Sequence, residues 1–312
     1  MIFFSTPKFW YRKDPGIFLR SMSEISGFIH GFFNKKEYKF NPSIKTIAIG
    51  GITVGGAGKT PVARYLGKIL TEYGYNPAIC LRGYGRKTDE DIVVDLSKHK
   101  FEDVGDEALL LAKEAKVIVA KSRKNGHDIA VKLGCDVLIL DDGLSQRDIL
   151  PTCKILVIDG YQGAGNGLMF PFGPLRQKIL PASQDADLIF LVNEDLHGLS
   201  QILPDCVKCK TVPDFSGIQK NIIAFSGLGM NEKFFASLRQ HFNVIKEFGY
   251  PDHYPYKDED LVNMSKYGIQ LVTTEKDFQR IPLHLRENVK YVKINLECND
   301  REKIAKMWQI SV

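Results

Sequence analysis

The sequence of 312 residues is poor in cysteine and contains no long uninterrupted apolar segment. Its six cysteines are too few for a disulfide framework in a chain of this length, which favours reduced thiols and a cytoplasmic protein. No uncharged apolar run approaches the ~20 residues that a membrane-spanning helix requires. The first residues also lack the charged, apolar and small-residue order of a signal peptide. These absences argue against secreted and membrane-spanning proteins.

One pair of cysteines, Cys206 and Cys209, has the CxxC spacing that many zinc sites use. No second cysteine pair or histidine pair follows at a matching distance. The sequence therefore favours ordinary core thiols over a metal site here, and no role is assigned to the pair.

The composition is typical of a globular protein with a sizeable core. Hydrophobic residues make up 44% of the chain and charged residues 25%, so one large or two medium domains are expected. The 42 Lys and Arg residues exceed the 37 Asp and Glu residues, which gives a net charge of +5. This charge suits an anionic partner, but it does not choose among nucleic acid, a phosphorylated lipid and an anionic membrane.

The segment from Ile17 to Phe33 has the pattern of an amphipathic helix. Apolar residues recur there every three or four positions, at Phe18, Met22, Ile25, Ile29 and Phe32, and Phe28 and Phe33 widen the stripe. Basic residues flank the segment at Arg12, Lys13, Lys35 and Lys36. Two interpretations stay open in equal measure: a helix that packs on the core, or a helix that lies in a membrane interface with its cations on anionic headgroups.

From Lys45 onward, short β-branched runs alternate with helical patterns, which predicts a parallel sheet with crossover helices. The first strands are expected at Thr46 to Gly50, Pro77 to Leu81, Val117 to Ala120, Val137 to Asp141, Ile155 to Asp159 and Leu188 to Val192, with helices at Pro61 to Tyr73, Asp106 to Glu114 and Arg123 to Leu133. A second series follows the proline-containing stretch from Leu203 to Pro213. Its strands are expected at Ile222 to Phe225, Val244 to Phe248, Gln270 to Thr273 and Tyr291 to Ile294, with helices at Asn231 to His241 and Asp300 to Trp308.

The strongest motif is a glycine-rich loop between an expected strand and an expected helix, Thr53-Val54-Gly55-Gly56-Ala57-Gly58-Lys59-Thr60. Such a P-loop turns backbone N–H groups toward phosphate oxygens, while Lys59 reaches the terminal phosphates and the Thr60 hydroxyl can bind magnesium. The usual pattern has glycine where this chain has Thr53. The alternative is a glycine-rich turn without a ligand, which the neighbouring strand and helix make the weaker interpretation.

Three further groups of residues carry weaker signals. Asp141 and Asp142 end an apolar strand in the manner of a Walker B motif, whose carboxylate can hold Mg²⁺. Asp106 and Glu107 begin an expected helix, where helix capping is the simpler explanation. His253 lies in a turn-like segment, and a lone histidine is more often structural than catalytic.

Together, these features predict an α/β protein with a P-loop NTPase-like parallel sheet flanked by helices. We expect an N-terminal amphipathic, membrane-associating segment at residues 1–40, a P-loop core domain at 41–210 and a smaller α/β domain at 211–312. Nine short motifs, taken in order and spacing, also resemble the tetraacyldisaccharide 4'-kinase family. They are Thr53 to Pro61, Leu81 to Arg86, Gly105 to Glu107, Asp141 to Gly143, Gly165 to Gly167, Gly173 to Arg176, Phe225 to Gly229, Pro251 to Tyr254 and Thr273 to Asp277.

The resemblance covers nearly the whole chain, and the family's own P-loop also lacks the first glycine. It implies transfer of the γ-phosphate of ATP, with Mg²⁺, to the 4'-hydroxyl of tetraacyldisaccharide 1-phosphate, giving lipid IVA. It also implies a peripheral protein on an anionic membrane, at the cytoplasmic face of the inner membrane, with no nucleic acid and no obligate protein partner. By matching motif, it implies residues 53–60 for the nucleotide and Asp106 with His253 as base and partner. Metal binding would fall to Thr60, Asp141, Asp142 and Glu107, and acceptor binding to Arg82 and Arg176.

The chain departs from the family in two places. At residues 144–146 this chain has Leu144-Ser145-Gln146, whereas the family commonly has an aromatic residue or Leu followed by Gln-His or Gln-Asn. After Arg176, Gln177 stands where the family has a glutamate. Two other functions therefore stay open. One is a P-loop NTPase that hydrolyses nucleotide to drive a partner protein, and the other is a nucleotide-binding membrane adaptor that has lost catalysis.

Overall fold

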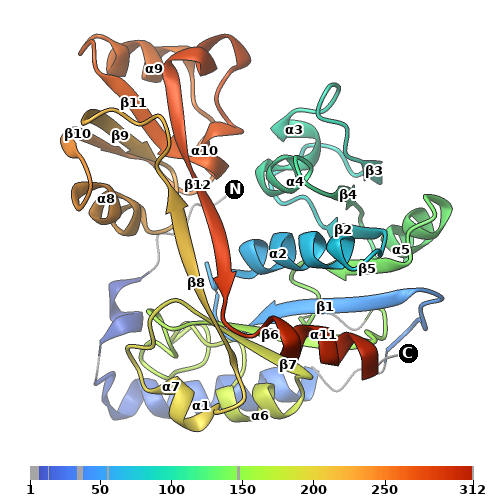
Figure 1. Cartoon of the computed structure of the whole chain (residues 1–312). Coiled ribbons are helices and arrows are strands. Elements are labelled where there is room, and N and C mark those ends of the chain that lie inside the picture. The colour runs from blue at the N-terminus through green and yellow to red at the C-terminus, as the bar shows by residue number, and fades with distance from the viewer. Residues whose placement is uncertain (1–6, 13, 34–37, 55, 146–147, 311–312) are drawn as a thin grey trace.

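The computed structural model describes residues 7–12, 14–33, 38–54, 56–145 and 148–310. A twelve-stranded sheet runs through the molecule in the order β10-β9-β11-β12-β8-β7-β6-β1-β5-β2-β4-β3 (Figure 1). The strands are β1 (Lys45–Gly51), β2 (Pro77–Leu81), β3 (Ile92–Val93), β4 (Lys116–Val119), β5 (Val137–Leu140), β6 (Cys153–Asp159), β7 (Leu188–Val192), β8 (Val207–Asp214), β9 (Asn221–Ser226), β10 (Asn243–Gly249), β11 (Gln270–Thr274) and β12 (Val289–Cys298).

Helices cover the sheet and fill its connections. They are α1 (Gly16–Phe33), α2 (Lys59–Glu72), α3 (Phe101–Val104), α4 (Asp106–Leu111), α5 (Arg123–Lys132), α6 (Ile179–Gln184), α7 (Leu199–Ile202), α8 (Asn231–Arg239), α9 (Asp258–Ser265), α10 (Glu275–Phe278) and α11 (Arg301–Ile310), with 3₁₀ turns η1 (Lys8–Tyr11) and η2 (Leu283–Asn288). The α/β class predicted from the sequence is confirmed. The predicted helix at 106–114 is shorter than expected, because α4 ends at Leu111.

The continuous apolar runs form the buried centre of the sheet. β1 lies between β5 and β6, and all three are parallel. Every residue of β2 and β5 is buried, as expected of strands that helices cover on both faces. The carboxyl ends of these strands therefore meet at one edge, which is where the phosphate-binding loop after β1 begins.

The proline-containing stretch from Leu203 to Pro213 is not a simple linker, because most of it belongs to β8. Val207 and Cys209 are buried while Lys208 and Lys210 are exposed, which is the alternation of a strand with one covered face. β8 pairs with β7 at its start and antiparallel with β12 at its end. The ribbon of β8 and β12 thus joins an N-terminal lobe (β1 to β8) to a C-terminal lobe (β9 to β12), as Figure 1 shows.

A disulfide bond joins Cys209 of β8 to Cys298 of β12, so the expectation that all six cysteines are reduced thiols is wrong for this pair. The antiparallel register places the two residues directly opposite each other, with their Cα atoms 4.1 Å apart. The sequence could not indicate the pairing because 89 positions separate the two cysteines.

α1 forms where the amphipathic segment predicts it, and Ser23 is buried in the described part of the helix. The Ser23 hydroxyl accepts the Met169 backbone N–H at 2.8 Å, and the Ser26 hydroxyl donates to the Phe170 carbonyl at 2.5 Å. Two residues of the predicted stripe are exposed, Phe18 at 75% and Ile25 at 56%, as is the neighbouring Ile17 at 85%, whereas Met22 of the stripe is half-buried.

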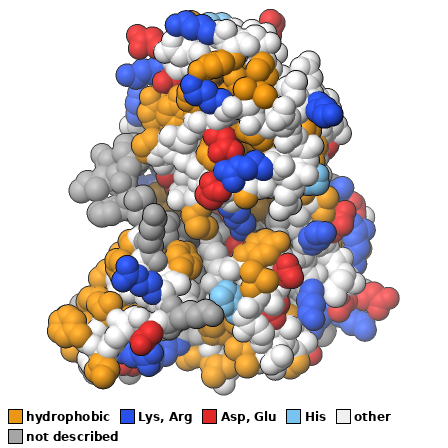
Figure 2. Space-filling view, turned by 90° about the vertical axis from the view of Figure 1, so that its left-hand side faces the viewer, with side chains coloured by type: hydrophobic (Ala, Val, Ile, Leu, Met, Phe, Trp, Pro, Cys, Tyr) orange, Lys and Arg blue, Asp and Glu red, His pale blue; other side chains and the backbone are white. Residues whose placement is uncertain are grey.

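Side chains of residues 28–33, including Phe28, Ile29 and Phe32 of the predicted stripe, lie outside the described residues, as do the flanking residues Lys13, Lys35 and Lys36. In Figure 2, hydrophobic side chains reach the surface at the lower end of the molecule, the end at which Figure 1 places α1, α6 and α7. Within the described ranges, no helix is long and apolar enough to cross a membrane.

Candidate active site

The glycine-rich loop leaves β1 at Gly51 and enters α2 at Lys59. Gly58 caps the helix in the left-handed region, with φ of +81°, a conformation that glycine adopts at little cost. A neighbouring segment holds the start of the loop: Thr53 pairs with Leu175, and the Val54 N–H donates to the Pro174 carbonyl at 2.8 Å. Gly56 is exposed and Ala57 is buried, whereas Gly55 lies outside the described residues.

This pairing places Arg176 near Lys59, and both side chains contact the carboxylate of Asp142. Arg176 Nη1 lies 3.1 Å from both oxygens of Asp142, and Lys59 Nζ lies 3.5 Å from Asp142 Oδ1. Burial of Asp142 opposes its ionisation, but the charges of Lys59 and Arg176 outweigh burial and lower its pKa. The structure therefore brings together Lys59, Asp142 and Arg176, to which the family resemblance assigns nucleotide, metal and acceptor binding respectively.

Asp141 has a different environment, although it is the adjacent residue. Its Oδ2 accepts a hydrogen bond from the Thr60 hydroxyl at 3.3 Å, and its Oδ1 is buried without a hydrogen-bond partner. Burial raises the pKa of Asp141 to about 6, and the negative charges of Glu107 and Asp142 add to this effect. A buried carboxylate oxygen that lacks a donor fits a cation.

No group of three or more His, Cys, Asp or Glu side chains that could hold a metal occurs in the described part of the chain. A cation beside Asp141 would thus take most of its ligands from phosphate and water, as Mg²⁺ commonly does in phosphoryl-transfer sites.

Asp106 begins α4, and the preceding glycine explains its position. Gly105 has φ of +86°, and a Cβ there would lie 2.8 Å from the Tyr84 carbonyl oxygen, so a larger residue would push the helix start away. Asp106 Oδ1 accepts the Glu107 backbone N–H at 2.9 Å in the first turn of α4, whereas the N-cap itself is Gly105. Asp106 Oδ2 points elsewhere, toward the C-terminal lobe.

Two C-terminal-lobe side chains converge on that oxygen. His253 Nδ1 lies 3.0 Å from Asp106 Oδ2, and Arg280 Nε lies 3.2 Å from the same atom. Burial disfavours the charged form of Asp106, yet Lys276, the His253 hydrogen bond and Arg280 together hold its pKa well below the usual range. Asp106 is therefore a buried carboxylate that stays ionised.

His253 reaches this position from a strained turn with φ of +58°. The His253 backbone N–H donates to the Gly227 carbonyl at 3.2 Å. Arg280 donates to the same Gly227 carbonyl and to the Tyr254 carbonyl, each at 3.1 Å. One buried guanidinium thus binds both the loop that carries His253 and the carboxylate that His253 faces.

Sequence reasoning gave no role to Lys276 and did not single out Arg280. Lys276 Nζ lies 3.2 Å from Glu107 Oε1 and 3.5 Å from His253 Nε2. Burial opposes the charge of Lys276, but Asp106 and Glu107 raise its pKa above the ordinary value. The only signal for Lys276 was its place in the motif from Thr273 to Asp277.

Arg82 follows β2 and is exposed, and Gln177 is half-buried next to Arg176. The Ser145 hydroxyl donates to the Asp142 carbonyl at 3.2 Å, and Gln146 lies outside the described residues.

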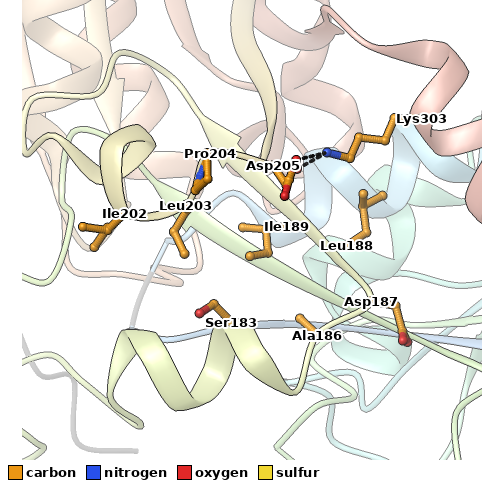
Figure 3. Close-up of a pocket in the computed structure, with 10 residues that line it drawn as sticks. All are labelled: Ser183, Ala186, Asp187, Leu188, Ile189, Ile202, Leu203, Pro204, Asp205 and Lys303. Atoms are coloured by element: carbon orange, nitrogen blue, oxygen red, sulfur yellow. Dashed lines mark hydrogen bonds and ion pairs between the residues drawn. The ribbon is translucent and has the colours of Figure 1, made fainter.

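A surface pocket of about 270 Å³ lies at the opposite edge of the sheet (Figure 3). Leu188 and Ile189, at the start of β7, line it together with Leu203 and the ion pair of Lys303 and Asp205. The phosphate-binding loop follows the carboxyl end of β1, which is parallel to β6 and, through it, to β7. This pocket is therefore separate from the candidate active site.

Comparisons with known proteins agree over nearly the full length. A family model described as LpxK, tetraacyldisaccharide-1-P 4'-kinase, matches residues 18–310. A tetraacyldisaccharide 4'-kinase of Methylorubrum extorquens is 34% identical over 316 residues, 96% of each chain. One of Paramagnetospirillum magneticum is 35% identical over 306 residues, 93% of this chain and 94% of that one. A crystal structure of LpxK from Aquifex aeolicus, described as an "apo" form in complex with ATP, has a TM-score of 0.74 and 25% identity, and covers 94% of this chain and 96% of that one.

Proposed function

Because the chain belongs to the tetraacyldisaccharide-1-P 4'-kinase family, we propose that it transfers the γ-phosphate of ATP to the 4'-hydroxyl of tetraacyldisaccharide 1-phosphate. The product is lipid IVA, and the reaction is a phosphoryl transfer to an alcohol. The observation that carries the proposal is the contact between Asp106 and His253, next to Glu107, whose charge acts on Asp141. The relatives that match this chain over nearly its full length are named as kinases. The NTPase and adaptor alternatives are therefore not favoured.

Asp106 would act as the base for the acceptor hydroxyl. The hydroxyl oxygen forms the new bond to the γ-phosphorus, the bond from that phosphorus to the β–γ bridging oxygen breaks, and ADP leaves. Asp106 Oδ2 already faces His253 and Arg280, while Oδ1, which accepts the Glu107 N–H, has a second lone pair for the hydroxyl proton. Because its pKa is low, we expect the proton to move late, after much of the phosphoryl transfer.

Lys59 and Thr60 would serve the nucleotide and the metal, with residues 53–58 around the phosphates. Asp142 pairs with both Lys59 and Arg176. We propose that phosphate oxygens take over these cations when ATP binds. Thr60 and the carboxylates of Asp141, Asp142 and Glu107 would serve Mg²⁺ directly or through water, with phosphate and water as most of its ligands. The ion would neutralise charge on the transferring phosphoryl group. Arg82, exposed at the end of β2, would contact the acceptor.

A lipid acceptor requires access to a membrane. We propose that α1 and its exposed apolar residues hold the protein on an anionic bilayer as a peripheral protein, at the cytoplasmic face of the inner membrane. The division into segments 1–40, 41–210 and 211–312 also remains a proposal. The ribbon of β8 and β12, which joins the two lobes, supports a boundary near residue 210.

Radiolabelled ATP incubated with and without the lipid acceptor tests the proposal directly. We expect label on the lipid only when both are present, and little phosphate release without the acceptor. Equal ATP consumption in both samples would support the NTPase alternative, and consumption in neither would support the adaptor.

A further inference from the structure

A charge network outside the site links the P-loop helix to the C-terminal lobe. Arg64 lies on α2, five positions after Lys59, and its Nη1 donates to Glu275 Oε2 at 2.8 Å. Its Nε and Nη2 donate to Glu114 at 2.7 and 2.5 Å. The Arg64 and Glu275 side chains are 10% and 5% exposed, so solvent screens their attraction little.

The Glu275 carboxylate of the C-terminal lobe pairs with two cations of the N-terminal lobe. Besides Arg64, its carboxylate faces Lys113, whose Nζ lies 3.4 Å from Oε1. Removing either cation would leave a buried carboxylate with less compensation, which is costly. Glu275 is also the first residue of α10, so this contact fixes where α10 begins relative to α2.

The same short helix carries the groups that face the catalytic pair. Lys276, the next residue, contacts Glu107 and His253, and Arg280 follows just beyond the helix and contacts Asp106. The segment from Glu275 to Arg280 therefore contacts the P-loop helix through Glu275. Its two positive charges, Lys276 and Arg280, face Asp106 and His253. A shift of α10 away from α2 would move both charges with it.

We propose that Arg64 is a positioning residue for the transfer reaction, and that its ion pair with Glu275 sets the lobe closure in which His253 meets Asp106. The inference rests on the proposed function. It links nucleotide binding on α2 to assembly of the acceptor-activating pair. Because Arg64 acts through that pair, its loss should lower the rate of transfer while ATP binding at the loop is kept.

Arg64→Met tests this, with Arg239→Met as the matched control. Arg239 also bridges two carboxylates through four hydrogen bonds, to Glu232 and Glu247, but all three lie within the C-terminal lobe. We expect Arg64→Met to lower kcat by at least about tenfold and to change the Kd for ATP by less than about threefold. Arg239→Met should leave kcat within about twofold of the wild type.

Combining Arg64→Met with Asp106→Asn distinguishes a positioning role of Arg64 from a general loss of folding or stability. If Arg64 acts through the pair, Arg64→Met should lower the residual activity of Asp106→Asn by less than about twofold. A full tenfold loss in that background, a wild-type kcat in the single variant, or an equal loss in Arg239→Met would overturn the inference. If Arg64→Met does not fold, Glu275→Gln decides by the same criteria, because it removes the charge and keeps the shape. A wild-type enzyme without acceptor-dependent transfer would instead refute the proposed function.

Discussion

His253 Nδ1 lies 3.0 Å from Asp106 Oδ2, although 147 positions separate the two residues in the sequence. Each residue comes from a different lobe, and each depends on an unusual backbone position beside it. Gly105 turns the chain before Asp106 with φ of +86°, and His253 itself has φ of +58°. Backbone strain of this kind persists only where surrounding contacts enforce it. Here Arg280 donates to the Tyr254 carbonyl next to His253 and to the Gly227 carbonyl, which also accepts the His253 backbone N–H.

The first prediction is that Asp106 and His253 act as one catalytic unit. Asp106→Asn should lower kcat by about 10² to 10⁴ because it removes the base, with a much smaller effect on ATP affinity. His253→Ala should lower kcat substantially as well. The double variant should be little worse than the poorer single variant, because groups that work together are not additive. Losses that multiply, or an Asp106→Asn variant whose main defect is a lower Tm, would restore the helix-capping interpretation.

Much of this arrangement could be predicted from local sequence. β1, β2 and β5 are continuous apolar runs, and their burial on both faces follows from that pattern alone. Phosphate binding by the loop that ends at Thr60 could also be predicted, since glycine, lysine and a hydroxyl at that spacing bind phosphate and metal. The contact between Asp106 and His253 was predicted from the family resemblance and not from their spacing.

What could not be predicted depends on partners that are distant in the sequence. Arg280 and Lys276 look like ordinary charges near a short helix, and only the packing of α10 on α4 turns them toward Asp106. The pairing of Cys209 with Cys298 depends in the same way on the register of two strands. β8 was missed for a local reason: Pro213 and the CxxC spacing concealed its alternation of buried and exposed residues.

The second prediction concerns the P-loop lysine. Lys59→Ala should abolish kinase activity, because a cation near the terminal phosphates stabilises the transferring phosphoryl group. The protein should stay folded, since Asp142 keeps its contacts with Arg176. The measurements are acceptor phosphorylation and the Tm, with Lys208→Ala, on the exposed side of β8, as the control. Near-normal turnover by Lys59→Ala would reject the P-loop assignment.

The third prediction concerns α1. Replacing Ile17, Phe18 and Ile25 by Ser should release the protein from anionic vesicles in a flotation assay, because these exposed residues supply the apolar contact. Their exposure also predicts an unchanged Tm.

The control for α1 replaces Val262 and Leu283 by Ser, since both are also exposed, at 51% and 66%, on the C-terminal lobe. Figure 1 places α9, which carries Val262, at the far end of the molecule from α1. Retained vesicle binding together with a collapsed fold in the α1 variant would favour a core helix.

The adjacent carboxylates Asp141 and Asp142 have opposite electrostatic environments. Burial and the charges of Glu107 and Asp142 raise the pKa of Asp141 to about 6, so its ionised form destabilises the folded protein. For Asp142, the charges of Lys59 and Arg176 outweigh burial and lower the pKa, so its ionised form stabilises the fold. The two neighbours should therefore respond to the same substitution with opposite changes in stability.

The last prediction is that Asp141→Asn abolishes kinase activity and yet raises the Tm of the nucleotide-free protein at about pH 7.5. A carboxyl whose folded pKa is raised loses stability as the pH rises through that pKa, so removing its charge should contribute about 1 to 3 kcal/mol at that pH. The gain should shrink as the pH falls through about 6 toward about 4, because the wild-type carboxyl is then protonated in the folded state and only partly ionised in the unfolded state. Asp142→Asn should instead lower the Tm at about pH 7.5, because its stabilising charge is present above the unfolded pKa and lost as the pH falls. Thermal unfolding of both variants across this range measures the difference. Equal destabilisation by the two substitutions would show that Asp141 is not an uncompensated buried charge, and would remove the electrostatic argument for a cation beside it.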